Sequence, residues 1–78
     1  MDVIMPEIGE DITQATISFW HIEEGEKINE GDDLVEMVTD KATFNVPAPV
    51  TGVLSKIMFE EGQTVKVGEV IAIIQEEK

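Results

Sequence analysis

The 78-residue chain contains no cysteine, no tyrosine and no arginine, so its cations are five lysines and one histidine. Without cysteine there is no disulfide framework, no thiolate nucleophile and no cysteine-based metal site, which fits a reducing compartment. The longest apolar runs, such as Val70-Ile71-Ala72-Ile73-Ile74, are far shorter than the roughly 20 residues of a membrane helix. Nothing at Met1 resembles a signal or transit peptide.

Positive charge is also scarce, because the five lysines face seventeen acidic residues and the net charge is −12. A field of this sign repels nucleic-acid phosphates and anionic lipid surfaces, so neither nucleic acid nor a membrane is expected as a partner. The acidic surface is explained either as a solvated face or as a device that keeps a tethered module from sticking to its neighbours.

An apolar share of 42% predicts a folded chain. The length predicts a single domain over residues 1–78, with no room for a deep catalytic cleft.

The sequence repeats itself with an offset of 37 residues, which sets residues 16–32 against 53–69 and keeps both glycine pairs in register. Pro6 then matches Pro47 once about four extra residues, assigned to 9–12, are skipped. Each half is too small to bury its own apolar face. The repeat therefore predicts a two-fold pseudosymmetric domain whose halves share one core.

Each half is predicted to form strands, because short apolar runs are bounded by Gly, Pro, Asn and Asp and no stretch keeps a helical period for three turns. An all-β sandwich or flattened barrel follows. The expected strands lie near 2–6, 14–22, 33–39, 42–47, 51–59 and 70–75, with very short ones at Lys27-Ile28 and Thr64-Val65.

The repeat also indicates which side chains are buried. Phe19 matches the charged Lys56, whereas its neighbour Trp20 matches Ile57, so the Trp20 side of this strand faces the core. In the two following strands Glu36 and Asn45 face water, and the alternate positions face inward. The side chains expected to point inward are Trp20, Ile22, Val35, Met37, Phe44, Val46, Ile57 and Phe59.

The feature that suggests chemistry is the short link Val38-Thr39-Asp40-Lys41-Ala42-Thr43, in which Asp40 and Lys41 alone make the turn between two strands. A link this short forms a tight hairpin, and a hairpin tip presents its side chain to solvent on a rigid base. Lys41 is the only lysine so placed, since its counterpart by the repeat, Lys78, is a chain end. Position alone leaves two readings open, a polar turn or a lysine offered for modification.

Several segments, taken in order along almost the whole chain, resemble the lipoyl domains of dihydrolipoyl acyltransferases. They are Thr39-Asp40-Lys41-Ala42 flanked by Leu34-Val35-Glu36 and Val46-Pro47-Ala48-Pro49-Val50-Thr51-Gly52-Val53, together with residues 4–10, 24–27, 31–32 and 61–65. The resemblance implies a flattened barrel of two four-stranded antiparallel sheets with the modified lysine at a hairpin tip.

By the same resemblance, lipoic acid is joined to the Lys41 amine as an amide by a lipoate ligase or by lipoyl synthesis enzymes, and Asp40 and Ala42 flank the site. The arm serves a 2-oxo acid dehydrogenase complex. It takes an acyl group from a thiamine-dependent decarboxylase, delivers it to coenzyme A in the acyltransferase core, and is reoxidised by dihydrolipoyl dehydrogenase. The domain itself would be a carrier and not an enzyme. The location implied is the bacterial or archaeal cytoplasm or the mitochondrial matrix, and the chain is expected to be a piece of a longer acyltransferase.

One departure is visible, because the family usually has Gly-Glu-Gly where this chain has Gly9-Glu10-Asp11. Asp tolerates unusual backbone angles better than most residues, though less well than Gly. In the family this loop lies beside the lipoyl lysine and helps the decarboxylase choose its own domain. Gly9, Glu10, Asp11 and Ile12 are therefore the expected partner-recognition residues.

Four alternative assignments differ from this one in features visible in the sequence. A biotinyl domain shares the fold but flanks its lysine with methionines, and the glycine-cleavage H-protein is longer with a different motif. A Schiff-base enzyme needs a lysine of lowered pKa, whereas Asp40 and the acidic surface favour the charged form; the lone His21, expected to face outward, is neither a metal ligand nor a base. A plain structural or interaction domain would take up no lipoate.

Overall fold

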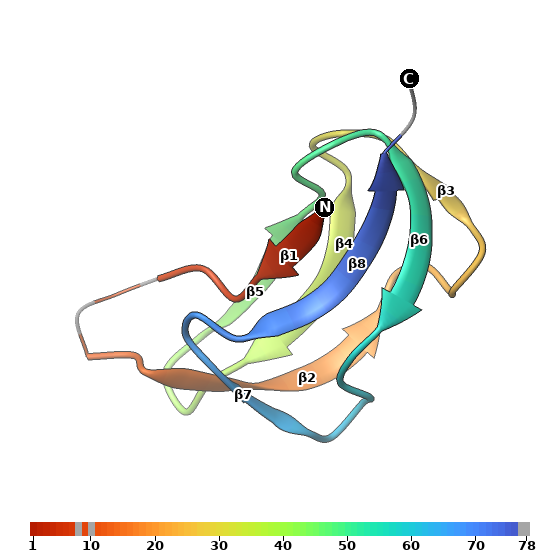
Figure 1. Ribbon diagram of the computed structural model, residues 1–78. Coiled ribbons are helices and arrows are strands. Elements are labelled where there is room, and N and C mark those ends of the chain that lie inside the picture. The colour runs from red at the N-terminus through yellow and green to blue at the C-terminus, as the bar shows by residue number, and fades with distance from the viewer. Residues whose placement is uncertain (8, 10, 77–78) are drawn as a thin grey trace.

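The computed structural model describes residues 1–7, 9 and 11–76, and over these residues the chain forms eight strands in two antiparallel sheets (Figure 1). One sheet has the order β1-β8-β6-β3 and the other β5-β4-β2-β7. The strands are β1 Asp2–Ile4, β2 Gln14–Trp20, β3 Lys27–Ile28, β4 Asp33–Val38, β5 Thr43–Pro47, β6 Gly52–Ile57, β7 Thr64–Lys66 and β8 Val70–Glu76. The predicted all-β fold of two four-stranded sheets is confirmed, with strand ends within two residues of those expected. No helix in the described part of the chain could cross a membrane.

The internal repeat is visible in the backbone, because each strand of one sheet has its counterpart in the other sheet at an equivalent place. The ladder between β2 and β4 pairs Thr16 with Val38 and is interrupted by a bulge before Phe19. The ladder between β6 and β8 pairs Val53 with Gln75 and is interrupted at the matching point, before Lys56. Both halves therefore build the same bent sheet, as a two-fold pseudosymmetric domain requires.

The predicted match of Pro6 with Pro47 is wrong. Met5 N donates to Glu69 O, and Ala48 N donates to Asp32 O, which is the position that matches Glu69 in the repeat. Met5 is thus the counterpart of Ala48, and Pro6 that of Pro49. The second half contains prolines at both 47 and 49, so only the hydrogen bonds distinguish the two alignments. Residues 7–13 stand where the other half has Val50 alone, and the insertion is longer than the sequence indicated.

Tight turns with glycine link the short strands in both halves. Glu26 N donates to Glu23 O at 3.1 Å, and the Glu26 carboxylate accepts Glu23 N at 2.8 Å. The third residue, Gly25, has φ of +93°, which a type II turn requires and which side chains disfavour. The matching turn at Gly62 is closed in the same way by Gln63. This duplicated turn explains why the first glycine of each pair recurs in the repeat.

The core lies between the two sheets and is entirely apolar in the described residues. Val35, Met37 and Val46 are buried as predicted, and Phe19 is exposed as predicted. The other predicted inward side chains pack against the core but are only partly buried: Trp20, Ile22, Phe44, Ile57 and Phe59.

Incomplete burial has a structural cause at the ends of β2 and β6. There residues of the two acidic turns border a groove, whose lining includes Trp20, Ile57, Glu23 and Glu60. Trp20 Nε1 also donates to Phe59 O at 2.9 Å, so the indole bonds one half of the repeat to the other. Hydrophobic character alone does not reveal that these positions lie at an open edge.

Candidate functional site

The predicted lysine lies on the hairpin between β4 and β5, formed by residues 39–42 and called here the lysine hairpin. Thr39 N donates to Ala42 O at 2.8 Å, while Ala42 N donates to the Thr39 hydroxyl at 3.0 Å. The same hydroxyl accepts Lys41 N at 3.2 Å and donates to Ala42 O at 3.1 Å. A threonine hydroxyl has one donor and two acceptor sites, and all are used here. The turn beneath Lys41 is therefore tied by a side chain as well as by the backbone.

Thr39 is the site residue whose role the sequence did not reveal, since the sequence places it in the link before Asp40 and Lys41 but assigns it no function there. A signal was present: Ser and Thr hydroxyls commonly bond backbone groups one to three residues on, which closes turns locally. No described non-glycine residue has positive φ, so the hairpin needs no left-handed residue. This permits a turn with Asp40 and Lys41 at its centre and no glycine.

Lys41 projects from this base with 63% of its side chain exposed, and Asp40 and Ala42 beside it are also exposed. The other described lysines lie on strands: Lys27 on β3, Lys56 on β6 and Lys66 on β7. Lys78, the counterpart of Lys41, lies outside the described residues. Among the described lysines, Lys41 alone is carried by a hairpin tip, as predicted.

The 7–13 insertion, called here the long loop, leaves the same end of the sheet as the lysine hairpin. Since β2 and β4 run antiparallel and Thr16 pairs with Val38, the segment before β2 lies beside the segment after β4. Val67 N anchors the end of the long loop by donating to Thr13 O at 3.0 Å. Strand topology thus brings two segments together that are about 30 residues apart in the sequence.

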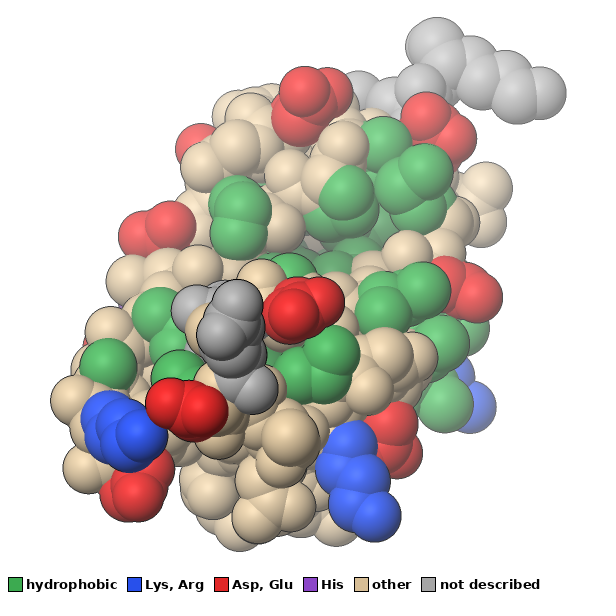
Figure 2. Space-filling model, turned by 90° about the vertical axis from the view of Figure 1, so that its left-hand side faces the viewer, with side chains coloured by type: hydrophobic (Ala, Val, Ile, Leu, Met, Phe, Trp, Pro, Cys, Tyr) green, Lys and Arg blue, Asp and Glu red, His purple; other side chains and the backbone are tan. Residues whose placement is uncertain are grey.

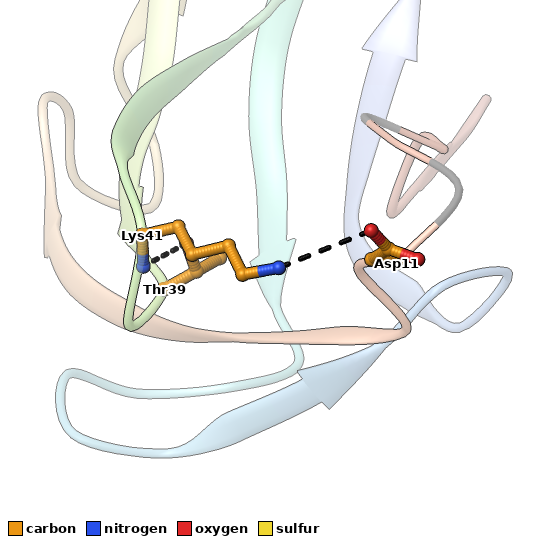
Figure 3. Close-up of polar contacts among 3 residues, drawn as sticks. All are labelled: Asp11, Thr39 and Lys41. Atoms are coloured by element: carbon orange, nitrogen blue, oxygen red, sulfur yellow. Dashed lines mark hydrogen bonds and ion pairs between the residues drawn. The ribbon is translucent and has the colours of Figure 1, made fainter.

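Lys41 Nζ lies 3.9 Å from Asp11 Oδ2 across the gap between the long loop and the lysine hairpin (Figure 3). Asp11 is 85% exposed, so solvent screens the pair and its contribution is at most about 1 kcal/mol. Of the other predicted recognition residues, Ile12 N donates to Gly9 O at 3.2 Å, which closes a turn with Asp11 inside it. Glu10 lies outside the described residues.

Asp11 occupies its place without a positive φ. Asp11 stands where the family of lipoyl domains usually has glycine, and it does so without the strain of a left-handed backbone conformation. Its effect is to add a carboxylate that faces the lysine.

Negative charge covers the molecule widely. Figure 2 shows acidic side chains spread over the whole face that bears the long loop, whereas the lysine side chains on that face lie in its lower part, at the height of the lysine hairpin in Figure 1. Positive charge on this face is thus concentrated near the end that carries Lys41.

His21 is exposed, as predicted, and lies away from the lysine hairpin. Its Nε2 is 2.8 Å from Asn45 Oδ1, and its ring packs edge-on against Phe19 with centroids 4.8 Å apart. His21 N donates to Leu34 O at the start of β4, whereas the lysine hairpin follows the end of β4. The described residues contain no group of three or more His, Cys, Asp or Glu side chains that could hold a metal ion.

Comparison with known proteins agrees with this geometry. A family model described as "Biotin-requiring enzyme" matches residues 1–74. The chain is 44% identical to the lipoamide acyltransferase component of the branched-chain alpha-keto acid dehydrogenase complex of Bacillus subtilis, over 94% of this chain and 17% of that protein. It is 46% identical to the acetyltransferase component of the pyruvate dehydrogenase complex of Corynebacterium glutamicum, over 92% of this chain and 11% of that protein.

Among solved structures, the lipoyl domain of the 2-oxoglutarate dehydrogenase complex from Azotobacter vinelandii is 32% identical and superposes with a TM-score of 0.80. The match covers 100% of this chain and 99% of that domain. The chain therefore belongs to the family of biotinyl and lipoyl attachment domains. Within it, the likeness along the full length of a solved lipoyl domain and to two acyltransferases identifies a lipoyl domain of the acyltransferase type.

The chain spans less than a fifth of the length of the curated relatives that it matches. The likeness is thus confined to a small carrier domain.

Proposed function

We propose that Lys41 carries lipoic acid in amide linkage and that the domain is the mobile carrier of a 2-oxo acid dehydrogenase complex. The observation that supports this most is the lysine hairpin itself, where an exposed amine stands on a turn tied by four hydrogen bonds. A modifying enzyme needs an accessible amine, and a carrier needs a fixed base for its arm.

The residues present fit the proposed group. Lys41 supplies a primary amine, and its exposure gives an acyl group room to reach the nitrogen. Lipoic acid would supply a ring disulfide that accepts an acyl group together with two electrons. The chain contains no cysteine or other redox side chain that could do this in its place.

The chain's own contribution is to hold and present the arm. The Thr39 hydroxyl accepts the backbone N–H groups of Lys41 and Ala42 and so fixes the backbone on both sides of the Lys41 Cα. Motion is then left to the Lys41 side chain and its attached group. Tethering of this kind raises the effective concentration of a carried group at successive sites. The proposed partners are a thiamine-dependent decarboxylase, the acyltransferase core and dihydrolipoyl dehydrogenase.

The relatives belong by name to three different complexes, for branched-chain 2-oxo acids, pyruvate and 2-oxoglutarate. The proposal therefore names the class of complex. Biotin is the main competing group, because the family model covers both attachments. The relatives named above are lipoamide or 2-oxo acid dehydrogenase proteins, which favours lipoate.

The test is lipoylation of the purified domain with a lipoate ligase, followed by intact-mass and peptide mass analysis. We expect the mass to rise by one lipoyl group, located on Lys41, and Lys41→Arg to abolish the increase. Lys56→Arg, a matched exchange on β6, should be modified like the parent. Lipoylation of Lys41→Arg, or uptake of biotin instead of lipoate with the corresponding ligases, would refute the proposal.

A further inference from the structure

The contact between Lys41 and Asp11 exists only while Lys41 is a cation. We propose that Asp11 makes the long loop sensitive to the modification state of Lys41. In the unmodified domain the ammonium holds the loop toward the lysine hairpin, and acylation of Lys41 releases it. This inference rests on the proposed attachment of lipoate to Lys41.

The chemistry of attachment removes one partner of the contact. An ammonium group that becomes an amide gives up two protons, and its nitrogen forms a bond to the carbon of the activated carboxyl group, which loses its leaving group. The nitrogen is then uncharged. Asp11 Oδ2, which lies 3.9 Å from that nitrogen, has no ion to face once the amide has formed.

Of the two segments that the contact joins, the long loop is the one expected to respond. The lysine hairpin is held by the hydroxyl of Thr39 and by the ladder between β4 and β5. In the described part of the long loop, the backbone bonds are the Ile12 to Gly9 turn and the anchor at Thr13. Release of Asp11 therefore alters the turn of residues 9–12 with little effect on the hairpin.

The repeat indicates that this coupling is an addition to the fold and not part of it. The second half passes from Pro49 to Thr51 through Val50 alone, so it has no segment that could place a carboxylate at the corresponding position. Asp11 is also free of backbone strain. A partner that binds the long loop would thus contact one surface in the unmodified domain and a different surface in the lipoylated domain.

The expected size of the effect is modest. Exposed ion pairs shift an equilibrium by up to about five-fold, and about 1 M salt, where the screening length is near 3 Å, largely removes this. An effect of this size is measurable as a change in the loop's population-averaged chemical shifts.

The experiment compares backbone amide chemical shifts of Gly9, Ile12 and Thr13 in five forms of the domain by NMR. The forms are the parent, the lipoylated parent, Lys41→Gln, Lys41→Arg and Lys56→Gln. Lys41→Gln removes the cation without adding an arm, Lys41→Arg keeps the cation, and Lys56→Gln makes the same charge change on β6. We expect lipoylation of the parent and the Lys41→Gln exchange to change the chemical shifts of these amides in the same direction. Lys41→Arg and Lys56→Gln should leave these chemical shifts at the parent's values. About 1 M salt should move the parent toward the neutral forms.

The inference is overturned if Lys41→Gln moves the loop amides no more than Lys56→Gln does, or if Lys41→Arg moves them as far as Lys41→Gln. It is also overturned if Lys41→Gln moves them while the lipoylated domain stays with the parent. Peptide mass mapping of the lipoylated sample reports separately on the attachment site, so failure of the proposed function is distinguishable from failure of the coupling.

Discussion

The two halves of this domain are alike wherever the scaffold is built and differ where the lysine is presented. Their ladders have the same register and the same bulge, and their glycine turns are closed by the same bonds. They differ at the long loop, which lies beside the lysine hairpin and which in the second half is Val50 alone. The repeat thus provides a symmetrical support, and this departure from it lies at the end of the molecule that carries Lys41.

A second departure lies elsewhere, at Gly52 on β6, and it provides the largest expected effect. Gly52 matches Ala15 in the repeat, yet a Cβ at Gly52 would collide with the backbone oxygen of Gln75. Gly52→Ala should therefore destabilise the fold by about 3 kcal/mol through overpacking against the backbone, and lower the melting temperature by more than about 10 °C. Thermal unfolding followed by circular dichroism measures this.

The reverse exchange in the other half, Ala15→Gly, is the control, and it should cost about 1 kcal/mol. Equal losses in the two variants would show that the halves are interchangeable at this position, contrary to the structure.

The second prediction makes the halves equal in length. Excision of residues 8–13 leaves Glu7 where the other half has Val50. Because closure entropy depends only weakly on loop length, the melting temperature and the extent of lipoylation should stay close to those of the parent. Reductive acylation of the lipoylated domain by its decarboxylase should fall by at least about ten-fold, equivalent to about 1.4 kcal/mol of lost recognition. Acylation at the parent's rate would show that the long loop has no part in partner choice.

The third prediction concerns the base of the lysine hairpin. Thr39→Val removes the hydroxyl that bonds Lys41 N and Ala42 N and should cost about 1 kcal/mol, or about 4–8 °C in melting temperature. It should also slow lipoylation, because the turn is then held only by the backbone bond from residue 39 N to Ala42 O. Thr39→Ser keeps the hydroxyl and should restore both values; a serine variant that behaves like the valine variant would argue against the hydroxyl's role.

The smallest expected effect is on the choice of attached group. Replacement of Asp40 and Ala42 by methionine should allow some biotinylation of Lys41, on the hypothesis that flanking residues help the two ligase classes distinguish domains of one fold. A streptavidin blot after treatment with a biotin ligase measures the gain. No signal above the parent would mean that the ligases recognise other features of the domain.

Alternation, glycine turns and the repeat predicted the all-β fold, the strand positions and the lysine hairpin, whereas the two four-stranded sheets were implied by the resemblance to lipoyl domains. The sequence was insufficient for the alignment of Pro6, for the extent of burial of two side chains and for one ion pair. Pro6 has two possible partners in sequence, Pro47 and Pro49, and only the bonds of Met5 and Ala48 select one. Trp20 and Ile57 were expected in the core because the repeat places them on the same inward face, but they line a groove at the ends of β2 and β6 and are only partly buried. The resemblance implied that the loop of residues 9–12 lies beside Lys41, but the ion pair between Lys41 and Asp11 depends on side-chain positions that the sequence does not contain.

Trp20 gives the domain an intrinsic spectroscopic probe. It is the only tryptophan in a chain that has no tyrosine, and its indole N–H is bonded to the backbone of the other half at Phe59. Selective excitation of this indole reports on one position at the junction of the halves, without any added label. Its emission should shift to longer wavelength when the halves separate, because the partly buried ring then enters water. Unfolding of the parent and of most variants named above can therefore be followed by fluorescence from one residue far from the lysine hairpin.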